Sequence, residues 1–249
     1  MKLMFVGDVN LGEYYLALGH GPKSYAQKNN GGVFAQVQDI FDGADFVVGN
    51  LEAPITTCNE NPDDPDCCIL KVQPDSAKQL KGAGFKLVQV ANNHVVQHGE
   101  NGFIETLGNL DGMGISYVGL NKQEPVVFNE KGQTFAFFAA SDVPDNTDKQ
   151  QGQYQRLDEF FVQAVERSVE DYDHVLVMLH WGLEESTTPL PYQRDLAARL
   201  KKAGVRAIIG SHPHLFYEIE SDENFVCAYS LGNFVFDLCW DHRLLKSGI

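Results

Sequence analysis

Two histidines stand directly after an apolar run near the C-terminal end of the chain. Residues 208–210 (IIG) are typical of a buried strand, and Ser211, His212, Pro213 and His214 follow them. A spacing of two residues places both imidazoles on one face of an extended segment, and Pro213 stiffens the turn where the strand ends. Imidazoles presented in this way are typical of metal ligands, although a solvated loop is the commoner origin of such a pair. The interpretation depends on which other residues meet at the same place.

Short apolar runs alternate with amphipathic stretches along the 249 residues. Strands alternating with helices indicate βαβ units and a largely parallel sheet, in an α/β fold. With 43% hydrophobic residues, the chain can form a single domain over residues 1–249. We predict strands at 2–6, 44–49, 85–91, 174–180 and 206–210, helices at 33–41, 74–84, 101–114, 156–171 and 192–204, a hairpin at 125–140 turning at Lys131 and Gly132, and a last apolar stretch at 225–236.

Polar side chains follow five of the predicted strands. In open α/β sheets ligands bind beyond the carboxyl ends of the strands, so these side chains are expected at one edge. A single Asp or Asn there is commonly a helix cap or a turn residue, but caps do not require three histidines at the same edge. Carboxylate oxygens with imidazole nitrogens suit manganese, iron or zinc, and two such ions can drive an in-line displacement. The residues are Asp8, Asn50 and Glu52, Asn93 and His94, His180, and His212 and His214.

Six short motifs occur in order along the chain: GDVNLG, GNLEAPI, VANNH, HWGLE, GSHPH and YSLGNFVFD. In this order they resemble the CapA family of poly-γ-glutamate capsule biosynthesis proteins, within the calcineurin-like metallophosphatase superfamily. The resemblance covers about residues 3–237. It implies a four-layer α-β-β-α sandwich of the metallophosphatase type. It also implies that the family's pattern continues beyond SLGNF, so we expect either a compact variant or a domain truncated at its C-terminus.

The resemblance further implies a dinuclear metal site. His94 would be the catalytic residue, which protonates the leaving oxygen or stabilises the transition state. The implied ligands are Asp8 and His214 for the first ion, Asn93, His180 and His212 for the second, and Glu52 as the bridge between them.

Several positions depart from the pattern that the chain resembles. Asn10 stands where the superfamily usually has a histidine, and Glu52 where it has an aspartate, so the first ion could be weakly bound or missing. Gln97 replaces an aspartate, Ser186 an aromatic residue and Ser211 a frequent histidine. These changes leave the implied ligands in place but alter the residues expected to contact substrate.

Four further residues are candidates for substrate contact or for support of the ligands: Asn10, Asn50, Trp181 and Asn233. Trp181 could form a stacking wall beside a substrate, but a Trp at a strand end more often packs in the core. Asn233 lies at a predicted turn, where its amide could support a ligand through a hydrogen bond.

Composition excludes some classes of function. A formal net charge of -15 argues against a nucleic-acid partner. No apolar run is long enough to span a membrane, and the N-terminus enters a strand at once. The chain as given is therefore expected to be cytoplasmic, or exported if a leader or anchor was removed. Cys58 is expected either to pair with Cys67 or Cys68, as in an exported protein, or to stay reduced.

Two hypotheses of function remain open. The first is a metal-dependent, phosphoesterase-like hydrolase related to capsule synthesis, which the three imidazoles and the Asn93-His94 pair favour. The second is a non-hydrolytic accessory or binding protein for poly-γ-glutamate assembly or export, in which one or two ions hold the anionic polymer. Asn10 and the changed substrate positions favour the second.

Overall fold

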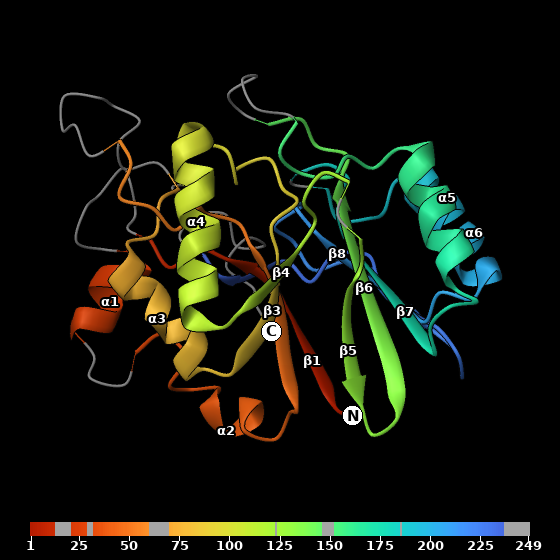
Figure 1. Ribbon diagram of the computed structural model, residues 1–249, viewed down its shortest axis with the longest axis horizontal. Coiled ribbons are helices and arrows are strands. Elements are labelled where there is room, and N and C mark those ends of the chain that lie inside the picture. Colours follow the sequence, from red (N-terminus) through yellow and green to blue (C-terminus); the bar gives the residue numbers. More distant parts are fainter. Residues whose placement is uncertain are drawn as a thin grey trace.

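The computed structural model describes residues 1–12, 21–28, 32–59, 70–122, 124–145, 152–184 and 186–236. Within these residues two β-sheets face each other, and helices lie on the outer side of each sheet (Figure 1). The strand order is β11-β1-β2-β3-β4 in the first sheet and β5-β6-β7-β8-β10-β9 in the second. The expected α/β sandwich is confirmed.

The first sheet is parallel throughout. Helices α3 (Pro74–Gly82) and α4 (Gly99–Met113) lie on its outer side, together with the short helices α1 (Pro22–Lys28) and α2 (Gln38–Phe41) (Figure 1). Its strands are β1 (Leu3–Val9), β2 (Phe46–Leu51), β3 (Phe85–Gln89), β4 (Ser116–Val118) and β11 (Asn233–Val235).

The second sheet is mixed. The predicted hairpin joins β5 and β6 as antiparallel neighbours, with positive φ at Lys131 and Gly132, and β9 and β10 are also antiparallel. Helices α5 (Glu159–Ser168) and α6 (Pro191–Ala203) cover its outer face (Figure 1). Its strands are β5 (Val126–Glu130), β6 (Gln133–Ser141), β7 (His174–His180), β8 (Ala207–Ser211), β9 (Ile219–Ser221) and β10 (Val226–Ala228).

Alternate residues of the second sheet enter two different cores. Phe137 and Ala139 of β6 pack with the first sheet, whereas Phe138 and Ala140 pack with residues of α5 and α6. Successive side chains of a strand point to opposite faces, so a strand buried on both faces reads as a continuous apolar run. This explains why the central strands were recognisable in the sequence.

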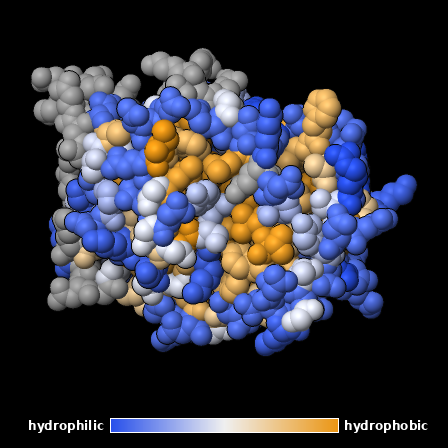
Figure 2. Space-filling view, viewed as in Figure 1, coloured by the Kyte–Doolittle hydropathy of each residue, from blue (hydrophilic) through white to orange (hydrophobic). Residues whose placement is uncertain are grey.

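The surface view shows where apolar side chains remain accessible. On the face of Figure 2 hydrophilic residues dominate, and hydrophobic ones gather near its middle, over β4 and β5 where the sheets meet. Val126, Val127 and Phe128 of β5 are half-buried. None of the described helices combines the length and the apolar character that crossing a membrane would require.

Several predicted boundaries were wrong. Of the predicted helix 33–41 only Gln38–Phe41 is helical, because Phe34 reaches the aromatic cluster with Phe41 and Phe85 from a series of turns. The predicted helix 156–171 is shorter, since the side chain of Asp158 caps it by accepting a hydrogen bond from the Phe161 amide. Helix α1 and strand β4 were not predicted. Cys67 and Cys68 lie outside the described residues.

Candidate metal centre

Two buried carboxylates stand at the end of the first sheet. Asp8 of β1 lies opposite Asn50 of β2, and Glu52 follows β2 directly. The Asn50 Nδ2 atom donates hydrogen bonds to Asp8 Oδ1 at 2.8 Å and to Glu52 Oε2. Asp8 and Glu52 are fully buried, so one amide group holds both carboxylates in place.

The loop after β3 is tied to this pair by Asn92. Its Nδ2 atom donates to Asn50 Oδ1 at 3.2 Å and to the Leu51 carbonyl at 2.8 Å. Its Oδ1 atom accepts from the His94 amide at 3.1 Å. Sequence reasoning singled out Asn93 and His94 and missed this role of Asn92, for which the only signal was a second Asn before the histidine.

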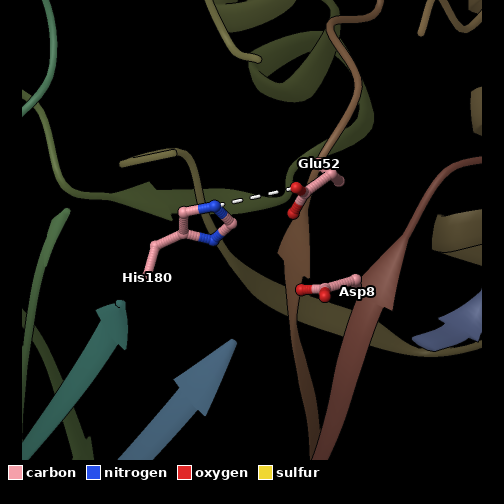
Figure 3. A group of neighbouring side chains, drawn as sticks. All are labelled: Asp8, Glu52 and His180. Carbon is pink, nitrogen blue, oxygen red and sulfur yellow. Dashed lines mark ion pairs between the residues drawn. The ribbon is translucent and has the colours of Figure 1, made fainter. Parts of the chain in front are cut away.

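The second sheet brings His180 to the same place, from the end of β7. Its Nε2 atom lies 2.8 Å from Asn93 Oδ1 and 3.7 Å from Glu52 Oε1. Figure 3 shows the imidazole and the Glu52 carboxylate pointing toward each other, with Asp8 beside Glu52. One ligand atom each from Asp8, Glu52 and His180 lies within 4.8 Å of the others. On the other side of the ring, Nδ1 lies 3.0 Å from Ser211 Oγ.

His212 and His214 reach the site by a route that the sequence did not predict. Strand β8 ends at Ser211, and the two histidines have φ values of 97° and 60°, so they do not share one face of an extended segment. Residues other than glycine rarely adopt positive φ, and such strain concentrates at functional sites. The His212 ring lies 4.8 Å from the His180 ring, and the His214 Nδ1 atom lies 3.3 Å from Asp8 Oδ2 and 2.8 Å from Asn233 Oδ1. The structure therefore brings both histidines next to His180 and Asp8.

Burial keeps three of the imidazoles neutral. It lowers the pKa of His94 to about 4, that of His212 to about 3, and that of His180 well below the usual value. Neutral imidazoles keep a lone pair, which is the form that binds a metal ion. Gln97 Oε1 lies 3.2 Å from His94 Nδ1, and Asn93 Nδ2 lies 3.2 Å from His94 Nε2.

The pKa of Glu52 responds to burial in the opposite sense. Burial and the charge of Asp8 raise the pKa of Glu52 well above its usual value. Burial lowers the pKa of His214, but the hydrogen bond and charge of Asp8 outweigh it and raise the pKa overall. Ionising two buried carboxylates in contact costs free energy because their charges repel, unless a cation is near.

Two buried polar atoms in the site have no hydrogen-bond partner among the described residues: Glu52 Oε1 and His212 Nδ1. Glu52 is fully buried and His212 is 6% exposed. A buried polar atom without a partner costs about 1–3 kcal/mol, so such atoms need an explanation. The oxygens of Asp8 and Glu52 and the nitrogen of His180, with the His212 ring next to His180, fit a divalent cation of the manganese, iron or zinc type.

Other candidate residues contribute less directly. Asn10 is buried, and its Oδ1 atom accepts from the Gly12 amide at 2.9 Å, so it stabilises the turn after β1. Trp181 is fully buried and donates from Nε1 to the Tyr229 carbonyl at 2.9 Å. Its environment corresponds to the packing interpretation rather than to a stacking wall. Ser186 Oγ donates to the Thr188 carbonyl within its own loop.

The comparison with protein families decides what kind of protein carries this site. The model of a family described as bacterial capsule synthesis protein PGA_cap matches residues 2–238. The chain belongs to this family. The expected resemblance to CapA proteins is thereby confirmed.

Two curated relatives are CapA proteins of bacilli. The chain is 32% identical over 250 residues to the PGA biosynthesis protein CapA of Bacillus subtilis, which covers 96% of the chain and 64% of the relative. It is 28% identical over 258 residues to the capsule biosynthesis protein CapA of Bacillus anthracis, covering 96% of the chain and 61% of the relative. The chain thus spans under two thirds of the length of either relative.

Solved structures share the fold. A putative 5'-nucleotidase from Staphylococcus aureus, solved with alpha-ketoglutarate, aligns with a TM-score of 0.60 at 14% identity, over 92% of this chain and 48% of that one. A hypothetical protein from Thermus thermophilus aligns with a TM-score of 0.54 at 18% identity, over 93% of this chain and 76% of that one. At such identities the likeness concerns the metallophosphatase-like fold alone.

Proposed function

We propose that this PGA_cap protein is a metal-dependent hydrolase with phosphoesterase-like chemistry, acting in capsule synthesis. The observation that carries the proposal is the pair of buried, unpartnered atoms, Glu52 Oε1 and His212 Nδ1, at the edge where both of the described sheets end. Glu52, Asn93, His180 and His212 would hold a divalent cation. Such a cation would supply Lewis acidity to the oxygens of an anionic substrate.

The residues of the chain supply position and a proton-exchanging group. Asn93 and Gln97 contact the two ring nitrogens of His94 and so fix its orientation at the rim of the ligand cluster. Because burial lowers the pKa of His94 to about 4, its ring is neutral at pH 7, and its Nε2 lone pair, which faces the Asn93 amide, would accept a proton from a reacting oxygen that takes the place of that amide. Burial of the surrounding side chains excludes water and strengthens each of these interactions.

The first test is metal content together with turnover. Protein purified without a histidine tag or a chelator should contain manganese, iron or zinc in near-stoichiometric amount and should hydrolyse p-nitrophenyl phosphate or bis(p-nitrophenyl) phosphate. His180→Ala should lose the metal, and His94→Ala should keep it and lose turnover by about 10²–10⁴-fold, the usual contribution of a proton-transfer residue. His174→Ala is the matched control, because His174 begins the same strand β7 and stacks on Phe135 far from the site.

A second candidate is a non-hydrolytic protein that holds poly-γ-glutamate through its metal ion. The observation that favours it is Asn10, which stands where the superfamily usually has a histidine and accepts a hydrogen bond from the Gly12 amide at 2.9 Å. This candidate predicts metal-dependent binding of poly-γ-glutamate with no release of shorter fragments. Turnover of any phosphoester that is lost in His94→Ala would contradict it.

A further inference from the structure

The two carboxylates of the site differ in how their oxygens are used. Both oxygens of Asp8 already accept hydrogen bonds or ion-pair contacts from the chain. Oδ1 accepts from Asn50 Nδ2 at 2.8 Å. Oδ2 accepts from the His212 amide at 3.4 Å and faces His214 Nδ1 at 3.3 Å. Asp8 is therefore satisfied by protein groups alone.

Glu52 has one oxygen in use and one without a hydrogen-bond partner among the described residues. Oε2 accepts from the same Asn50 amide, whereas Oε1 faces His180 Nε2 at 3.7 Å. A second ion held by both Asp8 Oδ1 and Glu52 Oε2 would lie between these two oxygens. The Asn50 Nδ2 atom already donates to both of them and takes that place.

A hydrogen bond from Asn92 fixes the orientation of the Asn50 amide. Asn92 Nδ2 donates to Asn50 Oδ1 at 3.2 Å, so the NH₂ group of Asn50 must face Asp8 and Glu52. Asn50 is itself 2% exposed and cannot turn away without losing these bonds. Its donors stand where a second cation would have to lie.

We propose that the site holds a single cation, bound by Glu52 Oε1, His180 Nε2 and Asn93 Oδ1 with His212 beside them, and that Asn50 sets this number at one. This proposal rests on the metal binding proposed above and departs from a dinuclear arrangement. Asp8 and His214 then form a hydrogen-bonded pair next to the cation rather than a second ion site. Asn50 acts as a positioning residue, because it touches the ligands and not the substrate.

The second nitrogen of His180 has a partner suited to this arrangement. Nδ1 lies 3.0 Å from Ser211 Oγ, and a hydroxyl oxygen can accept the ring proton when it resides on Nδ1. Without an ion Nε2 carries the proton and donates to Asn93 Oδ1 at 2.8 Å, and a bound cation would replace that proton while Nδ1–H donates to Ser211. Ser211 thus allows His180 to be a ligand for the one cation.

The test counts ions in four proteins. Each is stripped with a chelator, loaded with excess Mn²⁺, freed of unbound ion and measured by elemental analysis and by electron paramagnetic resonance. We expect the wild-type protein to bind one ion per chain with the spectrum of an isolated Mn²⁺. Asn50→Asp should bind two ions with a spin-coupled spectrum, because it replaces the blocking donor with a carboxylate.

The pair Asp8→Asn and Glu52→Gln keeps the test decisive if Asn50→Asp does not fold. Asp8→Asn should still bind one ion, with an affinity lowered by no more than the about 10–100-fold typical of a supporting residue. Glu52→Gln should bind none at the same concentration. Circular dichroism and thermal unfolding with chelator present show whether each variant is folded.

The outcomes separate the two proposals. Two spin-coupled ions in the wild-type protein, or loss of the single ion in Asp8→Asn with retention in Glu52→Gln, overturn the single-ion site and leave metal dependence standing. A folded Asn50→Asp that still binds one ion overturns the role of Asn50. A folded wild-type protein without any ion under these conditions overturns the metal-dependent function itself.

Discussion

The two sheets contribute to the site in different ways. The first sheet supplies carboxylates and carboxamides that are linked to one another, since Asn92 bonds Asn50 and Asn50 bonds both Asp8 and Glu52. The second sheet supplies imidazoles. The hydrogen bonds of these rings go mainly to other kinds of residue and not to another imidazole. His180 is oriented by Ser211, and the backbone after β8 turns through positive φ to present the other two.

This difference means that neither sheet alone would form the proposed metal site. Two ionised carboxylates side by side repel each other unless a cation or a proton lies near. The neutral imidazoles have lone pairs that can bind a cation. Packing of the two sheets brings oxygen and nitrogen ligands to within 4.8 Å. The packing of the two sheets therefore creates the candidate site as well as the core.

The largest loss of stability is expected at the close contact of Gly7 in β1 with Gly232. A Cβ at Gly7 would lie 1.9 Å from the Gly232 carbonyl oxygen, which accepts the Asp8 amide at 2.9 Å. Gly7→Ala must push apart the strand that carries Asp8 and the segment that crosses between the sheets. We expect the free energy of unfolding to fall by about 3 kcal/mol or more, as in severe overpacking, together with loss of bound metal. Urea denaturation measures it, and a change below about 1 kcal/mol would contradict the close approach.

The second prediction compares the carboxamide links of the first sheet with the hydrogen bond that orients His180 in the second sheet. Asn92→Ala removes the donor to Asn50 and to the Leu51 carbonyl and the acceptor of the His94 amide. Buried groups left unpaired cost about 1–3 kcal/mol, so we expect a loss of about 3 kcal/mol. Ser211→Ala removes mainly the bond to His180 and should cost about 1 kcal/mol.

Both variants are compared by denaturant unfolding with chelator present, so that bound metal does not affect the result. Equal losses in Asn92→Ala and Ser211→Ala would show that the carboxamide links add nothing beyond ordinary buried hydrogen bonds. A larger loss in Ser211→Ala would reverse the comparison between the sheets.

The ligand types and their strand ends were predictable because each depends on local sequence. An apolar run followed by Asp8, His180 or Asn93 indicates a strand end, and parallel strand ends meet at one edge. What the sequence alone did not show is how those side chains bond. The contact of Asn50 with Asp8 depends on the register of β1 against β2, 42 residues apart in the chain.

The loop of His212 and His214 was mispredicted for a related reason. A spacing of two fits an extended segment, but the positive φ of both residues is stabilised by partners from elsewhere, Asp8 and Asn233. Trp181 is buried, as the packing interpretation has it, and donates to the Tyr229 carbonyl. Motif order nevertheless identified the family, because six motifs in sequence carry more information than any one geometry. The single-domain interpretation stays a prediction.

A third prediction concerns pH and the segment after Glu52. Glu105 of α4 accepts hydrogen bonds from the Thr56 hydroxyl and from the amide and hydroxyl of Thr57. Burial raises the pKa of Glu105, but these bonds outweigh it and lower the pKa to about 2. A folded-state pKa below the unfolded value means that the stabilisation is complete above about pH 4.5 and is lost as the pH falls toward 2.

After allowance for solvent screening, the Glu105 contribution should be about 1–2 kcal/mol. Glu105→Gln should lower the free energy of unfolding by this amount at pH 7, and its difference from the wild-type protein should shrink between pH 4 and pH 2. Denaturant unfolding at several pH values measures both. A difference that stays constant over this range would rule out the ionised Glu105 as its source.

The smallest effect tests the same substitution as the first, away from both sheets. Gly108 lies in the middle of α4, and a Cβ there would have nothing within 4 Å. Alanine loses less backbone entropy than glycine in a helix, so Gly108→Ala should raise the free energy of unfolding by about 0.5–1 kcal/mol without changing metal content. Thermal and urea unfolding beside Gly7→Ala give the comparison. Because both variants add one methyl group, opposite signs would assign the cost at Gly7 to its close contact with Gly232, whereas destabilisation at Gly108 would mean that α4 tolerates no added side chain.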